Sequence, residues 1–170
     1  MTQSPAGTHR AEAPASVRCF VLTVSDTRTA DTDKSGDAIA AMLAAAGHTV
    51  GGRKIVKDDA RAIRDAVSYA AKSGSNDAVI TTGGTGISLR DVTPDVLAPL
   101  FERTLDGFGE LFRMLSYEQV GSASLMSRAT AGIVGRTAVF ALPGSENAVR
   151  LAMEKLILPE IGHIVRELRK

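Results

Sequence analysis

The sequence predicts an α/β fold, a three-layer sandwich in which a mostly parallel central sheet carries helices on both faces. The first observation is alternation: apolar runs rich in β-branched residues take turns along the chain with patterns of helical period. The second is that these apolar runs are continuous, which is typical of parallel strands buried on both faces. The third is a glycine-rich loop that joins one such run to a helix start.

Five elements are expected in the first half of the chain. The apolar runs have the length of strands, and the segments between them place apolar residues at helical spacing, as Ile63, Ala66 and Val67 show. Gly47 is the expected stop of the first helix. We predict a strand over 17–24, a helix over 34–46, a strand over 49–56, a helix over 60–72 and a strand over 78–82.

The second half is expected to continue this alternation. A helix is predicted after the glycine loop, with Thr93 as its N-cap and Pro94 as its first residue. Residues 105–126 are expected to form a turn and a short helix. A strand is predicted over 137–142, followed by a long final helix that Pro159 breaks or kinks.

The loop after the third predicted strand has the character of an anion-binding site. Gly83, Gly84 and Gly86 let backbone N–H groups approach an anion, and the hydroxyl of Thr85 adds a donor. Ligands of open α/β sheets lie at this end of the strands, so we expect a ligand of phosphate or pterin size here. A Walker A lysine and the last glycine of the dinucleotide fingerprint are absent. The alternative is a tight turn in which glycine serves shape alone, but the ionisable Asp91 nearby argues against it.

Polar residues also follow the other predicted strands, at what should be the same edge of the sheet. Each group has a purely structural alternative, because such residues also turn the chain or cap a helix N-terminus. Either Asp58 or Asp59 could cap the second helix, and Ser145 could cap the last one. The groups are Ser25 and Asp26, Asp58 and Asp59, and residues 143–147.

Asp58 and Asp91 are the pair that we expect to organise a metal ion. Mg²⁺ is usually held by one or two carboxylates, with phosphates and water completing its shell. Two separated carboxylates beside an anion-binding loop suit nucleotidyl transfer, in which Mg²⁺ neutralises phosphate charge. Arg90 and Arg128 are available as phosphate clamps or as ordinary surface residues. Cys19 lies within a predicted strand and no histidine falls in a candidate loop, so we expect no cysteine or serine–histidine nucleophile.

Composition and charge narrow the function classes further. The 170 residues fit one domain, expected over 17–170, after a flexible tail over 1–16 that is rich in Ala, Pro, Ser and Thr. With 20 Lys plus Arg against 19 Asp plus Glu, nothing favours nucleic acid or a membrane as partner. The single cysteine and the lack of a visible signal peptide favour a cytoplasmic protein. Three scattered histidines show no metal-ligand spacing, which argues against zinc.

Seven segments resemble the molybdenum cofactor biosynthesis family MoaB/MogA, which also occurs as one domain of gephyrin-like proteins. They are spread over nearly all of the chain after the tail, and residues 111–116 together with the short length look more like MoaB than MogA. The segments are Ser25–Arg28, Ile55–Asp58, Thr82–Gly86, Arg90–Asp95, Gly107–Glu110, Ser127–Ala129 and Leu142–Ser145.

The resemblance implies a molybdopterin-binding, Rossmann-like fold that assembles as a trimer or, in the MoaB branch, as a hexamer. It implies an adenylyltransferase that uses Mg²⁺ and ATP to adenylylate molybdopterin and releases pyrophosphate. Asp58 and Asp91 match the two acidic residues that active members require, so both are expected to be catalytic and to hold the metal. Other molybdenum cofactor enzymes are further candidate partners. The residues expected to bind substrate are Ser25, Asp26, Gly83, Gly84, Thr85, Gly86, Glu110, Arg128, Pro143, Gly144 and Ser145.

Three functional readings stay open at this point. Some MoaB proteins lack part of the pattern and are thought inactive, whereas this chain keeps both aspartates and Thr93-Pro94-Asp95, which favours an active enzyme. The main alternative is a non-catalytic molybdopterin-binding or carrier protein of the same pathway. A third reading is hydrolysis of nucleotide derivatives, as in competence-damage proteins, which usually carry a further C-terminal domain.

The segment 105–126 is also a candidate subunit contact. It contains more large apolar residues than a short helix can bury against its own sheet, although ordinary core is the alternative. These residues are Phe108, Leu111, Phe112, Met114, Leu115 and Tyr117.

Overall fold

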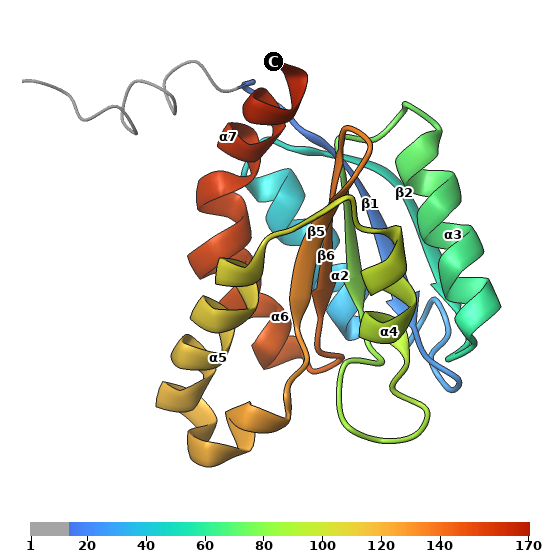
Figure 1. The fold of residues 1–170 in the computed structure, drawn as a ribbon, viewed down its shortest axis with the longest axis vertical. Helices are drawn as coiled ribbons and strands as arrows, with labels where there is room; N and C mark the ends of the chain where they lie inside the picture. The colour runs from blue at the N-terminus through green and yellow to red at the C-terminus, as the bar shows by residue number, and fades with distance from the viewer. Residues whose placement is uncertain (1–13) are drawn as a thin grey trace, which may run out of the picture.

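A single six-stranded sheet with the strand order β2-β1-β3-β6-β5-β4 forms the centre of the molecule (Figure 1). The structure is a computed structural model that describes residues 14–170, so most of the tail predicted over 1–16 lies outside the described residues. Four strands are parallel, and β5 runs antiparallel to its neighbours β6 and β4. The strands are β1 Arg18–Val24, β2 Thr49–Val56, β3 Ala78–Thr82, β4 Arg103–Thr104, β5 Thr130–Val134 and β6 Thr137–Leu142.

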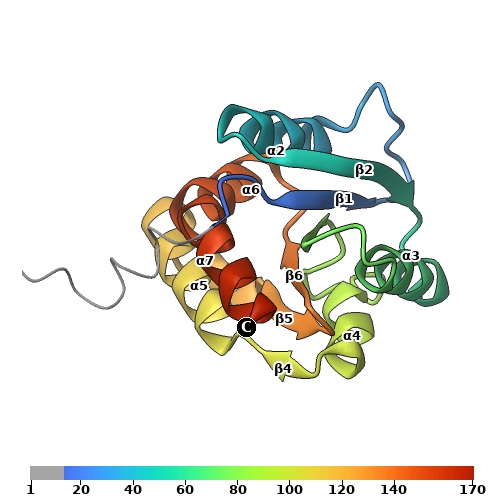
Figure 2. The same cartoon turned by 90° about the horizontal axis from the view of Figure 1, so that it is seen from above.

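Helices cover both faces of the sheet, as seen from above in Figure 2. On one face the buried side chains of four helices pack with alternate residues of the strands, and on the other face two helices do the same. The three-layer α/β sandwich predicted from the sequence is therefore confirmed. The first set is α2 Lys34–Ala45, α5 Asp106–Val120, α6 Glu146–Ala152 and α7 Leu158–Arg169, and the second is α3 Ala60–Lys72 and α4 Thr93–Leu97.

Most predicted elements agree with the structure to within a residue or two, but the second half differs in three ways. The segment expected as a short helix is the 15-residue α5, followed by a 3₁₀ segment over Gly121–Met126. The hairpin strand β5 and the short edge strand β4 were not predicted. Pro159 does not break the last helix: it lies in the first turn of α7, where its missing N–H is tolerated, and a π-helical turn over Met153–Ile157 joins α6 to α7.

The parallel strands end in register, which brings their polar extensions together. Val24 pairs with Val56 across β1 and β2, and Thr82 pairs with Leu142 across β3 and β6. Backbone hydrogen bonds continue the ladder beyond the strands, from Ser25 N to Val56 O (2.8 Å) and from Gly83 N to Leu142 O (2.9 Å). The loops after β1, β2, β3 and β6 therefore share one edge of the sheet. Within residues 14–170, none of the helices has the length and apolar character needed to cross a membrane.

Candidate active site

A cleft of about 540 Å³ opens at this edge of the sheet. Four segments line it: the glycine loop, the loop after β1, the end of the 3₁₀ segment and the loop after β6. Seven residues expected to bind substrate line it, together with Asp91. The lining is Val24, Ser25, Thr27, Arg28, Gly83, Gly84, Thr85, Gly86, Asp91, Met126, Ser127, Pro143 and Gly144.

The first two glycines of the loop are required by both conformation and space. Gly83 and Gly84 have φ values of +107° and +65°, a region that side chains rarely adopt. A Cβ on Gly83 would lie 2.1 Å from the carbonyl oxygen of Val24, and one on Gly84 would lie 2.5 Å from Thr93 Oγ1. The loop backbone therefore runs close to β1 and α4. This close approach is to protein atoms, and the predicted approach of the loop N–H groups to an anion remains a prediction.

Thr93 closes the loop in a different way from the predicted N-cap. The N-cap position of α4 is Val92, and Thr93 is the first helical residue. Its backbone N–H donates to the carbonyl of Gly84 (3.0 Å) and its hydroxyl donates to the carbonyl of Gly83 (3.0 Å). The prediction of a capping role was wrong, because a hydroxyl buried under the loop bonds the loop carbonyls instead of the helix N–H groups.

Arg128 holds the two stems of the glycine loop together. Its Nε donates to the carbonyl of Gly86 (2.8 Å), another guanidinium nitrogen donates to the carbonyl of Asp91, and Nη1 forms an ion pair with Asp95 (2.9 Å). Its backbone N–H donates to Thr85 O (2.8 Å). These bonds direct the guanidinium at the protein, and the predicted contact of Arg128 with substrate remains a prediction.

Three carboxylates converge beside the loop. Asp58 N donates to Asp26 Oδ1 (3.3 Å), Asp26 forms an ion pair with Arg90, and Asp91 Oδ2 accepts from the backbone of Ser88 (2.9 Å). Burial first, and then the charges of Asp26 and Asp91, raise the pKa of Asp58, while Arg90 lowers it. Among the described residues, Asp58 Oδ1 is buried without a hydrogen-bond partner. A buried acceptor of this kind is stabilised by a cation.

The carboxylate cluster fits a metal ion held jointly by the protein and a phosphate ligand better than a metal ion held by protein side chains alone. No group of three or more His, Cys, Asp or Glu side chains among residues 14–170 is arranged to hold a metal. Two carboxylates with phosphate oxygens and water are a common Mg²⁺ shell, so Asp58 and Asp91 could hold the ion once a phosphate ligand is present. Asp59 has a different role, since its side chain caps α3 by accepting a hydrogen bond from Ala62 N (2.8 Å). The structure thus separates the two neighbouring aspartates.

The other expected site residues divide into two groups. Pro143 and Gly144 line the cleft, and Thr82 donates to the carbonyl of Pro143 (2.9 Å) to fix that loop. Ser145 caps α6 by accepting from Ala148 N (3.4 Å) and lines an adjoining pocket of about 320 Å³. Glu110 is exposed on α5 and is not part of the cleft lining. Within one copy of the chain, Glu110 therefore lies outside the cleft in which it was predicted to contact substrate.

Arg28 is a cleft residue that the sequence reasoning did not select. It lines the cleft and its Nη2 donates to the carbonyl of Gly144 (2.6 Å). The available signal was its position two residues after Asp26, at the end of a strand that was expected to lead to the ligand. From sequence alone, an arginine in a polar loop is not distinguished from a solvated surface residue.

Comparison with known proteins identifies the family of the chain. A family model described as a probable molybdopterin binding domain matches residues 20–163. Molybdenum cofactor biosynthesis protein B of Bacillus subtilis (strain 168) is 55% identical over 163 residues, covering 95% of this chain and 96% of that protein.

Solved structures extend the similarity to three dimensions. A crystal structure of molybdenum cofactor biosynthesis protein B superposes with a TM-score of 0.90 at 52% identity, over 93% of this chain and 99% of that one. The tungsten cofactor synthesizing protein MoaB from Pyrococcus furiosus superposes with a TM-score of 0.83 at 44% identity, over 93% of this chain and 100% of that one. The chain therefore belongs to the MoaB/MogA family of molybdenum cofactor biosynthesis proteins.

Proposed function

We propose that the chain is a molybdopterin adenylyltransferase that uses Mg²⁺ and ATP and releases pyrophosphate. The observation that carries the proposal is the position of Asp58 and Asp91 over the glycine loop. A Cβ on Gly84 would lie 2.8 Å from Asp58 Oδ1, and one on Gly86 would lie 2.8 Å from Asp91 Oδ2, so each carboxylate lies directly against the loop. The unpartnered Asp58 Oδ1 favours an occupant that carries positive charge.

The residues of the cleft divide the work of this reaction. The glycine loop offers backbone N–H groups to phosphate oxygens, and Asp58 and Asp91 hold Mg²⁺ in the presence of ATP. A terminal phosphate oxygen of molybdopterin attacks the α-phosphorus of ATP, the new P–O bond forms, and the bond to the bridging oxygen breaks as pyrophosphate leaves. Bound Mg²⁺ supplies neutralisation of the charge on the phosphate oxygens. Catalysis then rests on positioning and charge, because the chain needs no nucleophile of its own.

The test is an assay of pyrophosphate release and of adenylylated pterin with molybdopterin, ATP and Mg²⁺. Asp58→Asn and Asp91→Asn are expected to reduce turnover by about a hundredfold or more, since loss of one group that stabilises developing charge costs about 10²–10³. Asp59→Asn is the matched control. It alters the neighbouring carboxylate and keeps a side chain that can cap α3, so activity should stay at the wild-type level.

The outcomes separate the enzyme from a carrier protein. Product formation that both site variants abolish and the control retains would support the enzyme. Tight binding of molybdopterin without consumption of ATP would identify a non-catalytic pterin-binding protein of the same pathway. Unchanged turnover in Asp91→Asn would refute the assigned role of that carboxylate.

We also propose that a second copy of the chain covers α5. Of the apolar residues noted in this segment, Phe108 and Phe112 are buried under the helix. Leu111, Met114 and Tyr117 are 47%, 57% and 62% exposed and follow each other at helical spacing. An unpaired apolar stripe of this kind is typical of a subunit contact.

A further inference from the structure

Arg28 is the one cationic side chain among the described residues that line the cleft. The carboxylates beside the glycine loop are Asp26, Asp58 and Asp91. Arg90 and Arg128, the two other arginines near the loop, are not part of the cleft lining. Asp91 lines the cleft itself, so an anionic ligand entering the cleft would meet a negative side chain there. Without a cation facing the ligand, the backbone N–H groups of the loop would have to offset that repulsion.

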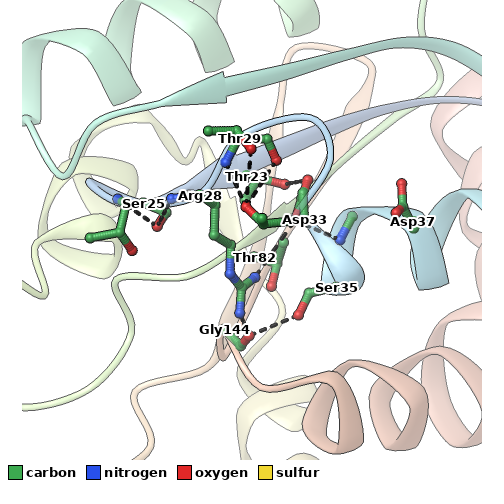
Figure 3. A network of polar contacts seen from close by, with 12 residues as sticks. Thr23, Ser25, Arg28, Thr29, Asp33, Ser35, Asp37, Thr82 and Gly144 are labelled. Atoms are coloured by element: carbon green, nitrogen blue, oxygen red, sulfur yellow. Dashed lines mark hydrogen bonds and ion pairs between the residues drawn. The ribbon is translucent and has the colours of Figure 1, made fainter.

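A buried carboxylate, that of Asp33, forms an ion pair with Arg28. Asp33 is 1% exposed, and its Oδ1 lies 3.6 Å from Nη1 of Arg28 (Figure 3). Thr23 Oγ1 donates to Asp33 Oδ2 (2.6 Å), and the backbone of Gly36 donates to Oδ1 (3.0 Å). These bonds fix the carboxylate between the end of β1 and the start of α2.

The guanidinium of Arg28 is held on a second side as well. Nη2 donates to the carbonyl of Gly144, which also accepts from Ser35 Oγ (2.8 Å) (Figure 3). The Arg28 backbone N–H donates to Ser25 Oγ (3.2 Å). The side chain is 29% exposed, so part of it is free to meet a ligand while the rest is restrained. A restrained arginine loses little freedom on binding an anion.

We propose that Arg28 binds the phosphate monoester end of the pterin substrate and that Asp33 is a positioning residue that acts through Arg28. This rests on the proposed function for the substrate, and it adds a binding residue and its support. The planar guanidinium suits bidentate contact with phosphate oxygens, and a fixed carboxylate behind it sets its orientation. Asp33 itself is buried and does not touch the ligand.

Arg53 provides a matched control on the other side of Asp33. Its Nη2 lies 3.5 Å from Asp33 Oδ2 and 2.7 Å from Asp37 Oδ1. It lines a separate pocket on the outer side of β2 and is not part of the cleft lining. Arg53→Gln therefore removes the same charge and a contact to the same carboxylate, without changing the cleft.

The experiment is anaerobic calorimetric titration of molybdopterin, and of the same pterin with its phosphate removed, in the absence of ATP. Arg28→Gln is expected to weaken molybdopterin binding about 10- to 100-fold, the range for a charge-assisted hydrogen bond, and to leave binding of the dephosphorylated pterin unchanged. Asp33→Asn keeps a side chain that can cap α2 and should weaken molybdopterin binding about 3- to 10-fold, because it loosens Arg28 without removing it. Arg53→Gln should bind both pterins as the wild type does.

A positioning role predicts strong coupling between the two residues. In the Arg28→Gln background, Asp33→Asn should cause no further loss of affinity, whereas a purely structural role would lower the affinity for both pterins. Arg28→Gln changes a partly exposed residue, so it tests the phosphate contact even if Asp33→Asn does not fold.

Two results would overturn the inference, and they differ from failure of the proposed function. Equal binding of molybdopterin by wild type and Arg28→Gln would remove the phosphate contact. An equal loss in Arg53→Gln would show that charge alone, at any place near Asp33, explains the effect. If the wild-type protein binds neither pterin, the proposed function itself fails.

Discussion

Replacement of Gly84 by alanine gives the sharpest test of how the loop and the carboxylates depend on each other. Gly84 has φ +65°, and its Cβ would lie 2.5 Å from Thr93 Oγ1 and 2.8 Å from Asp58 Oδ1. Gly135, in the hairpin turn between β5 and β6, has φ +61° and nothing within 4 Å of its Cβ position. The two alanine variants therefore share a backbone cost and differ in the steric contact at the site.

The expected magnitudes follow from that difference. A non-glycine residue in the left-handed region costs about 1–2 kcal/mol, which is the expected loss for Gly135→Ala. Crowding a packed position adds about 1–3 kcal/mol, so Gly84→Ala should lose about 2–5 kcal/mol in total. The added Cβ must displace the hydroxyl of Thr93 and the carboxylate of Asp58, so the proposed adenylyl transfer should also fall sharply.

Urea unfolding at one fixed protomer concentration, followed by circular dichroism, measures both losses. Pyrophosphate release measured on the same samples reports the site. Gly135→Ala is expected to retain full activity. Equal destabilisation in the two variants, or full activity in Gly84→Ala, would refute the reasoning that the loop backbone is packed directly against the carboxylate of Asp58, the proposed metal ligand.

Two further predictions concern charge and assembly. The pKa of Asp58 is raised, so the folded protein holds this proton more tightly than the unfolded chain does. Ionisation of Asp58 therefore lowers the free energy of unfolding as pH rises through the raised pKa. Well below the ordinary value of 3.8 the group is protonated in both states and has no such effect. Asp58→Asn should thus raise Tm at pH 7 and leave it unchanged at pH 3, and a lower Tm for this variant at pH 7 would contradict the reasoning. In the wild type, Mg²⁺ affinity should increase with pH over the same interval. Met114→Glu places a charge in the exposed stripe of α5 and should shift the protein towards smaller species in light scattering, whereas an unchanged mass, or a wild-type monomer, would remove the proposed contact.

Several elements were predictable because their signal is local. The strands β3 and β6 are runs of buried apolar and small residues with clear ends, and the stripe of α3 follows helical spacing from Ile63 to Ala70. The convergence of Asp26, Asp58 and Asp91 also followed from the sequence, since parallel strands end at one edge of a sheet.

The strand β5 escaped prediction for a tertiary reason. It contains Gly132, which is unfavourable in an isolated strand. In the folded chain the ring of Phe101 lies on that glycine, 2.3 Å from the position of its missing Cβ. A residue 31 positions earlier in the sequence thus explains the glycine, and no local pattern contains that information.

The sequence was sufficient for the layered α/β architecture, the glycine loop and the placement of Asp58 and Asp91 beside it, because the hydrophobic period and the parallel order of the strands fix where the backbone runs. Side-chain partnerships were decided by packing. Asp58 and Asp59 are adjacent in sequence, yet one lies in the carboxylate cluster and the other caps a helix. By sequence Asp33 is an ordinary N-cap candidate for α2, and only the folded loop between β1 and α2 brings its buried carboxylate to the guanidinium of Arg28. Contacts of this kind need side chains within a few ångströms of each other, and they stabilise the protein because they are buried. Both conditions arise only when the chain is folded.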